Sequence, residues 1–92
     1  MGITVYVSTV SSNVDIKKQQ QRINMILSSK KFEFEEVDIS SSEDDKARMR
    51  DICKDPKALP PQITNGDQYC GDFAKFELAV EDEILEEFLK LK

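Results

Sequence analysis

The chain has 92 residues, of which 39% are hydrophobic and 34% are charged, and its formal net charge is −5. This length and balance predict one globular domain over residues 1–92 and exclude a disordered chain. No apolar run approaches the roughly 18 residues of a membrane span and no signal-peptide pattern is present, so we expect a cytoplasmic protein, also nuclear by diffusion, without membrane insertion.

Basic and acidic side chains are unevenly distributed along the chain. Residues 1–31 hold five Lys or Arg against one Asp, and residues 32–92 hold eight against seventeen. A solvated acidic surface is the simplest interpretation, because proteins that bind phosphate groups concentrate more positive charge than the first segment does. We therefore expect protein partners, no nucleic acid partner, and a monomer.

The first half of the chain predicts a strand, a helix and a second strand. Residues 3–8 have the period-two alternation of a strand, and residues 32–39 repeat it. Between them, Ser12 is the expected cap of a helix that ends near Ser29. Its buried face is expected to hold Ile16, Ile23, Ile26 and Leu27. Because this connection contains a helix, the two strands are expected to be parallel.

The middle of the chain predicts a second helix. Serines at 40–42 and carboxylates at 43–45 are typical of a helix N-terminus, where they cap the backbone and face the positive end of the dipole. The expected buried stripe is Ala47, Met49, Ile52 and Cys53. Pro56 ends this helix.

The last third predicts a hairpin and a final helix. Pro60 and Pro61 lack amide hydrogens, so the next strand begins only at Gln62. The dipeptide Asn65-Gly66 predicts a type I′ turn between two short strands. Asp72 is placed to cap the final helix, whose apolar positions run from residue 73 to residue 89 across an acidic break at 81–83.

Catalytic residue types are scarce. Histidine is absent, which removes Ser-His and Cys-His catalysis. Cys53 and Cys70 match neither a zinc spacing nor a Cys-x-x-Cys motif, and a disulfide between them would be unusual in a reducing cytosol. The acidic segment 40–45 lacks the ligand spacing and glycine of an EF-hand, so we expect no metal site; a calcium-responsive adaptor stays a third alternative.

Several runs of the sequence resemble one known family. Pro60-Pro61-Gln62-Ile63 and residues 65–72, together with residues 5–6, 37–40 and 87–91, are similar to the Src-homology-3-domain-binding glutamic-acid-rich-like family. The resemblance covers nearly the whole chain, and it extends to the glutaredoxin branch of the thioredoxin fold. It implies a three-layer α/β fold of glutaredoxin topology, with a four-stranded mixed sheet flanked by helices.

The same resemblance implies that the redox centre of a glutaredoxin is missing. The nucleophilic cysteine corresponds to Ser11, within one residue, and the resolving cysteine corresponds to Val14. A serine hydroxyl is far harder to ionise than a thiol, and the chain has no histidine to act as its base. We therefore predict a protein that is not an enzyme and has no catalytic residues.

The resemblance also implies a remnant of the glutathione site. The cis proline of glutaredoxins corresponds to Pro61, and the residue whose backbone amide holds glutathione corresponds to Pro60, which has no N–H. Gly71 and Asp72 match the part of the site that holds the γ-glutamyl end. No cofactor is expected, and weak glutathione binding stays open.

We predict a non-catalytic protein-interaction module or modulator that binds partners in this groove. The groove is expected to be bounded by Ser11, Ser12, Asn13, Val14, Pro60, Pro61, Gly71 and Asp72. The alternative is a weak glutathione-binding redox modulator that uses Cys70 as its reactive thiol. Binding of an SH3 domain through a polyproline segment is not expected, because no two prolines have the P-x-x-P spacing.

Overall fold

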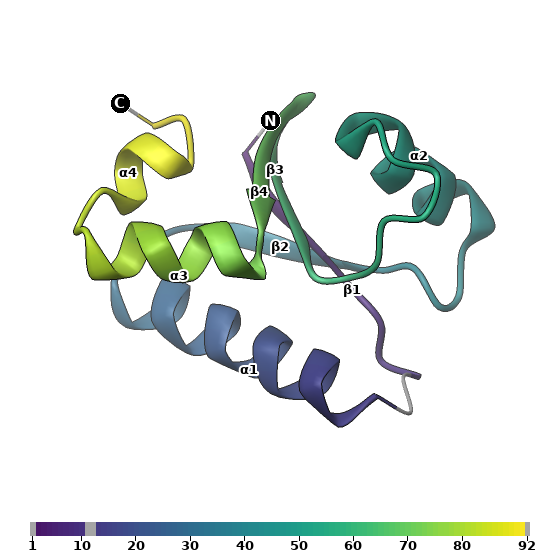
Figure 1. The fold of residues 1–92 in the computed structure, drawn as a ribbon, viewed down its shortest axis with the longest axis horizontal. Coiled ribbons are helices and arrows are strands. Elements are labelled where there is room, and N and C mark those ends of the chain that lie inside the picture. Colours follow the sequence, from purple (N-terminus) through teal and green to yellow (C-terminus); the bar gives the residue numbers. More distant parts are fainter. Residues whose placement is uncertain (1, 11–12, 92) are drawn as a thin grey trace.

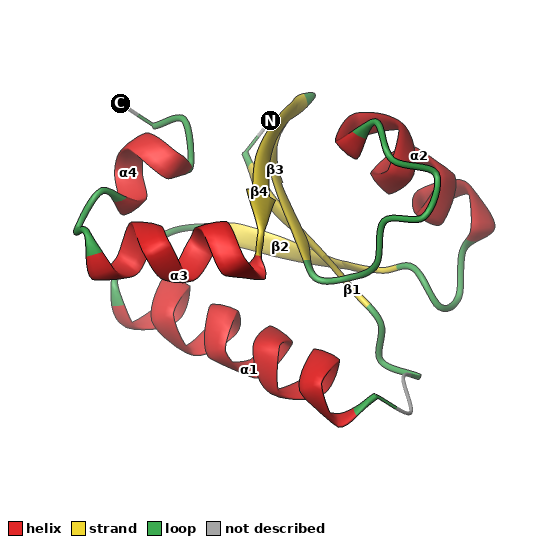
Figure 2. Cartoon of the chain, viewed as in Figure 1, coloured by secondary structure: helices red, strands yellow, loops and turns green. Residues whose placement is uncertain are grey.

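The protein is described by a computed structural model over residues 2–10 and 13–91. Three layers are visible in Figure 1, with secondary structure distinguished in Figure 2. The helices α1 (Val14–Ser29), α3 (Phe73–Glu81) and α4 (Leu85–Phe88) cover one face of a sheet, and α2 (Glu43–Cys53) covers the other. The predicted three-layer α/β architecture is confirmed.

The central layer is a mixed sheet of the strands β1 (Ile3–Val7), β2 (Phe34–Asp38), β3 (Gln62–Asn65) and β4 (Gln68–Asp72). Their order across the sheet is β2-β1-β3-β4. The β1–β2 pair is parallel, as the intervening helix predicted, and the β1–β3 and β3–β4 pairs are antiparallel. Two strands, β1 and β3, therefore lie inside the sheet and are paired on both edges.

The alternation of side chains along β1 contributes residues to two separate hydrophobic cores, and Ile63 of β3 contributes to one of them. Val5 and Ile63 are fully buried in the larger core, where α1, α3 and α4 meet the sheet. The smaller core lies under α2 and contains Tyr6, Ile39, Met49 and Ala58. The loop that follows α2 thus belongs to the smaller core through Ala58.

Helix caps agree with the sequence at α3 and differ at α1. The Asp72 carboxylate accepts the backbone N–H of Lys75 at 3.1 Å, so the predicted cap of α3 is confirmed. The cap of α1 is Asn13, whose side-chain oxygen accepts the N–H of Asp15 at 2.9 Å. We predicted Ser12, which lies outside the described residues.

The hairpin turn is displaced by one residue from its predicted position. Asn65 still belongs to β3, and the two residues between the strands are Gly66 and Asp67. Gly66 alone of this pair has a positive φ, of 60°. Asn65 stays in the ladder because it pairs with Ile3, and its side-chain Nδ2 also donates to the Leu89 carbonyl at 2.8 Å.

Two expectations about helices are wrong. Ala47 is exposed rather than buried, so the buried face of α2 rests mainly on Met49, which is fully buried. The final apolar run forms two helices instead of one. The acidic break separates them at Glu83, which has a left-handed φ of 58°.

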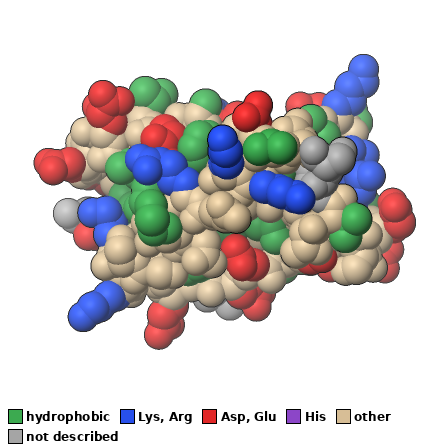
Figure 3. Space-filling view, turned by 90° about the horizontal axis from the view of Figure 1, so that it is seen from below, with side chains coloured by type: hydrophobic (Ala, Val, Ile, Leu, Met, Phe, Trp, Pro, Cys, Tyr) green, Lys and Arg blue, Asp and Glu red, His purple; other side chains and the backbone are tan. Residues whose placement is uncertain are grey.

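Both signs of charge occur on the face of the molecule on which α1 lies (Figure 3). On the face seen from below α1, Lys and Arg side chains are spread across the middle with hydrophobic side chains among them, and Asp and Glu lie mainly toward the rim (Figure 3). An ion pair between Arg22 and Glu77 links α1 to α3. Among the described residues, no helix is long and apolar enough to cross a membrane.

Replacing Gly71 by Ala is expected to lower the free energy of unfolding by about 2 kcal/mol, measured by urea denaturation. Gly71 has a φ of 154°, and an added Cβ would lie 2.9 Å from Cε1 of Phe88 and 3.0 Å from Cβ of Lys75. The matched control is Gly2→Ala, because nothing lies within 4 Å of a Cβ at that position. Equal stability of the two variants would contradict the packing described for Gly71.

Candidate functional site

The candidate site is a groove of about 530 Å³ where three segments meet. The first turns of α1 form one wall, the segment 55–62 forms the second, and the start of α3 forms the third. Its lining residues are Asn13, Asp15, Ile16, Gln19, Asp55, Lys57, Ala58, Leu59, Pro60, Pro61, Gln62, Asp72, Phe73 and Ala74. Half of them are apolar.

The second wall of the groove is held in place by side chains from α2 and the sheet. Arg50 Nε donates to the Ala58 carbonyl at 3.3 Å, and Gln62 Nε2 donates to the Leu59 carbonyl at 2.8 Å. The Tyr69 hydroxyl in turn donates to Gln62 Oε1 at 2.7 Å. Because both polar ends of the buried Gln62 side chain are hydrogen-bonded, the cost of removing them from water is offset while the side chain fixes the loop.

This arrangement exposes one apolar side chain of the second wall and buries its neighbours. The Leu59 side chain is 62% exposed, although its carbonyl is hydrogen-bonded. Pro60 and Pro61 are buried, and the peptide bond between them is cis, as the family resemblance implied. These two prolines therefore form part of the groove floor and do not project as a polyproline ligand.

The structure brings together part of the predicted site. Four predicted residues line the groove: Asn13, Pro60, Pro61 and Asp72. Val14 is exposed at the start of α1 without lining the groove, and Gly71 is buried against Phe88. Ser11 and Ser12 lie outside the described residues.

Several groove residues were missed by the sequence reasoning. Asp55 and Leu59 belong to a loop without regular structure, and only the folded chain places them opposite α1. Ile16 was assigned to the buried face of its helix, and it is half-buried at the groove instead.

Neither cysteine lines the groove. Both are free thiols; Cys70 packs against the larger core and Cys53 against the smaller. Burial raises the pKa of the Cys70 thiol to about 11, and the opposing effect of Lys90 is smaller. Burial also raises the pKa of Cys53, assisted by the nearby Asp55 carboxylate, although the Tyr69 hydroxyl acts in the opposite direction.

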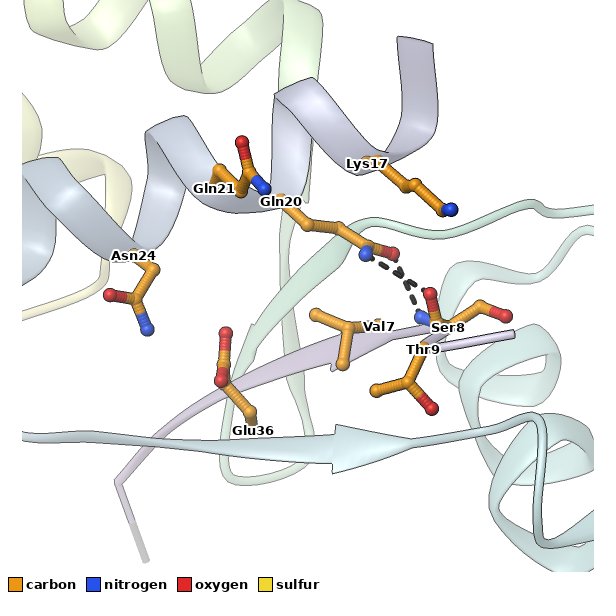
Figure 4. A pocket seen from close by; sticks show the side chains of 8 residues that line it. All are labelled: Val7, Ser8, Thr9, Lys17, Gln20, Gln21, Asn24 and Glu36. Atoms are coloured by element: carbon orange, nitrogen blue, oxygen red, sulfur yellow. Dashed lines mark hydrogen bonds between the residues drawn. The ribbon is translucent and has the colours of Figure 1, made fainter. Parts of the chain in front are cut away.

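A second cavity, of about 450 Å³, lies between α1 and the ends of β1 and β2 (Figure 4). Its central side chain is already engaged by the chain itself. Gln20 Oε1 accepts the N–H of Ser8 at 2.8 Å, and Gln20 Nε2 donates to the Ser8 carbonyl at 3.1 Å. This pair of hydrogen bonds ties α1 to the residue that follows β1, so we interpret the cavity as part of the structural framework.

Asp38 holds the loop after β1 against the end of β2. Its carboxylate accepts the Ser40 hydroxyl and the Thr9 hydroxyl, each at 2.6 Å. It also accepts the backbone N–H groups of Ser40 at 2.9 Å and Thr9 at 3.3 Å. These hydrogen bonds, that from the Ser40 side chain foremost, keep the pKa of Asp38 well below its usual range.

The structure contains no arrangement of three or more His, Cys, Asp or Glu side chains suited to a metal ion within the part of the chain that it describes. The groove carboxylates Asp15, Asp55 and Asp72 are therefore spread along its walls and do not converge on one point. Asp72 is moreover committed to capping α3.

Comparison with known sequences identifies one family. The sequence model described as "SH3-binding, glutamic acid-rich protein" matches residues 1–92. A curated relative from Drosophila melanogaster, the "SH3 domain-binding glutamic acid-rich protein homolog", is 43% identical over 103 residues. The alignment covers 99% of this chain and 65% of the relative, so the chain spans about two thirds of that protein's length.

Comparison with solved structures identifies the fold. The C. albicans actin interacting protein Aip5 superposes with a TM-score of 0.81 at 21% identity, covering 99% of this chain and 90% of that chain. A buckwheat glutaredoxin–glutathione complex superposes with a TM-score of 0.70 at 12% identity, covering 97% of this chain and 76% of that chain. Both likenesses establish the glutaredoxin-like topology.

Replacing Asp38 by Asn is expected to lower the free energy of unfolding at neutral pH by about 1 kcal/mol, since charge-assisted hydrogen bonds are lost. The folded-state pKa of Asp38 is depressed, so its contribution is present above the unfolded-state pKa of about 4 and is lost as pH falls below it. The stability gap between wild type and variant should therefore narrow in acid.

Urea denaturation at pH values from neutral to below about 4 measures the difference in free energy of unfolding between wild type and Asp38→Asn. Asp67→Asn is the control, because the Asp67 side chain is 92% exposed and its ion pair with Arg48, at 3.3 Å, lies at the surface, where such pairs add little stability. A gap that stays constant down to pH values far below about 4 would contradict the role described for the Asp38 carboxylate.

Native Cys70 is expected to react with iodoacetamide at neutral pH no faster than Cys53 and far more slowly than free cysteine. The reason is that burial leaves both thiols almost entirely protonated. Mass spectrometry of the alkylated protein, with a urea-unfolded sample as the reference, measures both rates. Preferential labelling of native Cys70 would revive the interpretation of a reactive thiol at that position.

Proposed function

We propose, because this chain belongs to the SH3-binding, glutamic acid-rich protein family, that it is a non-catalytic binding module of glutaredoxin-like fold. Its groove holds an extended segment of a partner protein. The module works in a reducing compartment such as the cytosol, which suits its two free cysteines. It needs no cofactor, and it acts by binding instead of by redox turnover.

One observation carries this proposal: a formed groove is lined by Asn13, Pro60, Pro61 and Asp72, which the family resemblance assigns to the former glutathione site, and its described lining holds no thiol. The sequence over residues 11–14 is Ser-Ser-Asn-Val, so the start of the first helix supplies none either. A groove without a nucleophile can still bind a partner segment, but it cannot carry out covalent catalysis.

The printed family name refers to SH3 binding, and the groove proposal differs from recognition of a polyproline segment. SH3 domains recognise an exposed polyproline II ligand. Pro60 and Pro61 are buried here, and the sequence has no P-x-x-P pair. Aip5 is named as an actin interacting protein, but its 21% identity supports only the fold for this chain.

A glutathione-dependent redox role is the competing function. The family resemblance assigns Asp72 to the γ-glutamyl end of glutathione, and its place in the groove lining supports residual binding. Catalysis would additionally need a thiolate, and the raised pKa of Cys70 disfavours one at neutral pH. These points support glutathione as an incidental ligand at most.

The catalytic part of the proposal is tested by reduction of hydroxyethyl disulfide with glutathione and glutathione reductase. We expect no rate above background for the wild-type protein, with an active glutaredoxin as the positive control. The Cys53→Ser and Cys70→Ser variants should be indistinguishable from wild type. An activity that disappears in Cys70→Ser would overturn the non-catalytic interpretation.

The binding part is tested with binders selected from a random peptide library displayed on phage. We expect Leu59→Asp to weaken the selected peptides about tenfold or more, because an unpaired charge would replace an apolar contact. Leu78→Asp is the matched control, because Leu78 is 60% exposed and does not line the groove, against 62% for Leu59. Equal losses in both variants would contradict binding in the groove.

A further inference from the structure

The charge of the groove restricts the segment that it accepts. We propose that the occupant is an extended protein segment in which an apolar side chain is flanked by arginine or lysine. This inference rests on the proposed function and specifies the partner's chemistry. It depends on two independent features of the lining, an apolar floor and an excess of carboxylates.

The apolar floor accounts for the hydrophobic side chain of the occupant. Ile16 on the α1 wall and Phe73 on the α3 wall are half-buried, and the buried pair Pro60–Pro61 also lines the groove. Leu59 stands at the side with most of its side chain in water. An apolar side chain of a partner would cover these surfaces and remove them from water.

The carboxylates of the groove are the reason to expect basic side chains in the occupant. Asp15, Asp55 and Asp72 line the groove, and Lys57 is the one cation among the described lining residues. The N-termini of α1 and α3 add about half a positive charge each. The three carboxylates together outweigh the positive charge of Lys57 and of the two helix N-termini, so the groove keeps a negative potential.

The helix N-termini themselves offer little to an anion. The Asn13 side chain accepts the N–H groups of Asp15 and Ile16, and the Asp72 side chain accepts that of Lys75. The first-turn donors that would hold a carboxylate are therefore partly occupied by side chains of the protein. Glutathione, which carries two carboxylates and one ammonium group, is disfavoured for the same reason.

The Asp55 and Asp72 carboxylates also act on the corner next to the groove. Burial is the main cause that raises the pKa of the Tyr69 hydroxyl and of the Cys53 thiol, and both carboxylates raise it further. Lys75, which does not line the groove, already has its ammonium 5.9 Å from the centre of the Tyr69 ring. A cation of the protein itself thus lies at this corner, as cation–π attraction predicts.

The test uses short acetylated and amidated peptides that alternate valine with arginine, glutamine or glutamate. Each is titrated into ¹⁵N-labelled protein and followed by amide NMR, with glutathione as a fourth probe. We expect the arginine peptide to shift the amides of Ile16, Gln62 and Phe73 and to bind about tenfold more tightly than the glutamine peptide. The glutamate peptide and glutathione should bind most weakly, and added salt should weaken the binding of the arginine peptide.

Variants assign the preference to the groove carboxylates. In the double variant Asp15→Asn and Asp55→Asn, the arginine and glutamine peptides should bind within about twofold of each other. Lys57→Gln should make the arginine peptide bind more tightly. Asp44→Asn is the control, because it removes an exposed carboxylate from the first turn of α2, away from the groove. Asp72 is left unchanged because it caps α3.

The outcomes separate this inference from the proposed function. Equal binding of the arginine and glutamine peptides at the groove would overturn the charge preference and leave groove binding intact. A preference that survives the double variant would also overturn it. Failure of every peptide to shift groove amides, together with peptides selected from the library that bind elsewhere, would remove both the inference and the proposed function.

Discussion

The antiparallel pairing of β1 with β3 is the constraint on which the remaining structure depends. Both strands are internal to the sheet, so their side chains must be covered on two faces. Helices α1, α3 and α4 pack on the face that contains Val5 and Ile63, and α2 packs on the opposite face, which contains Tyr6. The groove follows from this division, because its walls come from helices on one face and from the loop that leaves the helix on the other.

Polar side chains hold the walls of the groove in place. Where the fold could place a thiol, this sequence has Ser-Ser-Asn-Val, and the neighbouring side chains serve mainly to fix the backbone. Asn13 and Asp72 cap helices, and Gln62 bridges the Leu59 carbonyl and the Tyr69 hydroxyl. Such pre-organisation reduces the conformational entropy lost when a flexible segment binds. The groove therefore has the pre-organisation that the proposed binding of a partner segment would use.

Local signals in the sequence predicted most of the fold and only part of the site. Alternation in β1 and the cap at Asp72 depend on neighbouring residues, so they could be predicted correctly. The turn shifted by one residue because Asn65 is held by the Leu89 carbonyl, which lies 24 positions away. Ala47 is exposed because α2 alone covers its face of the sheet and turns a single narrow stripe inward. The wall around Asp55 required the tertiary structure, since no periodicity marks a loop.

The two cores differ in size, and this difference affects how the groove moves. Four buried residues make up the smaller core, against eleven in the larger one, and α2 with the 55–61 loop depends on the smaller. Partial unfolding that separates α2 from the sheet thus costs less free energy than global unfolding, and it removes one wall of the groove while the other two stay in place. Amide hydrogens of α2 should accordingly exchange with deuterium before those of β1, and a segment bound across all three walls would slow that exchange. Occupancy of the groove would thereby be transmitted to the far face of the sheet as a change in local stability.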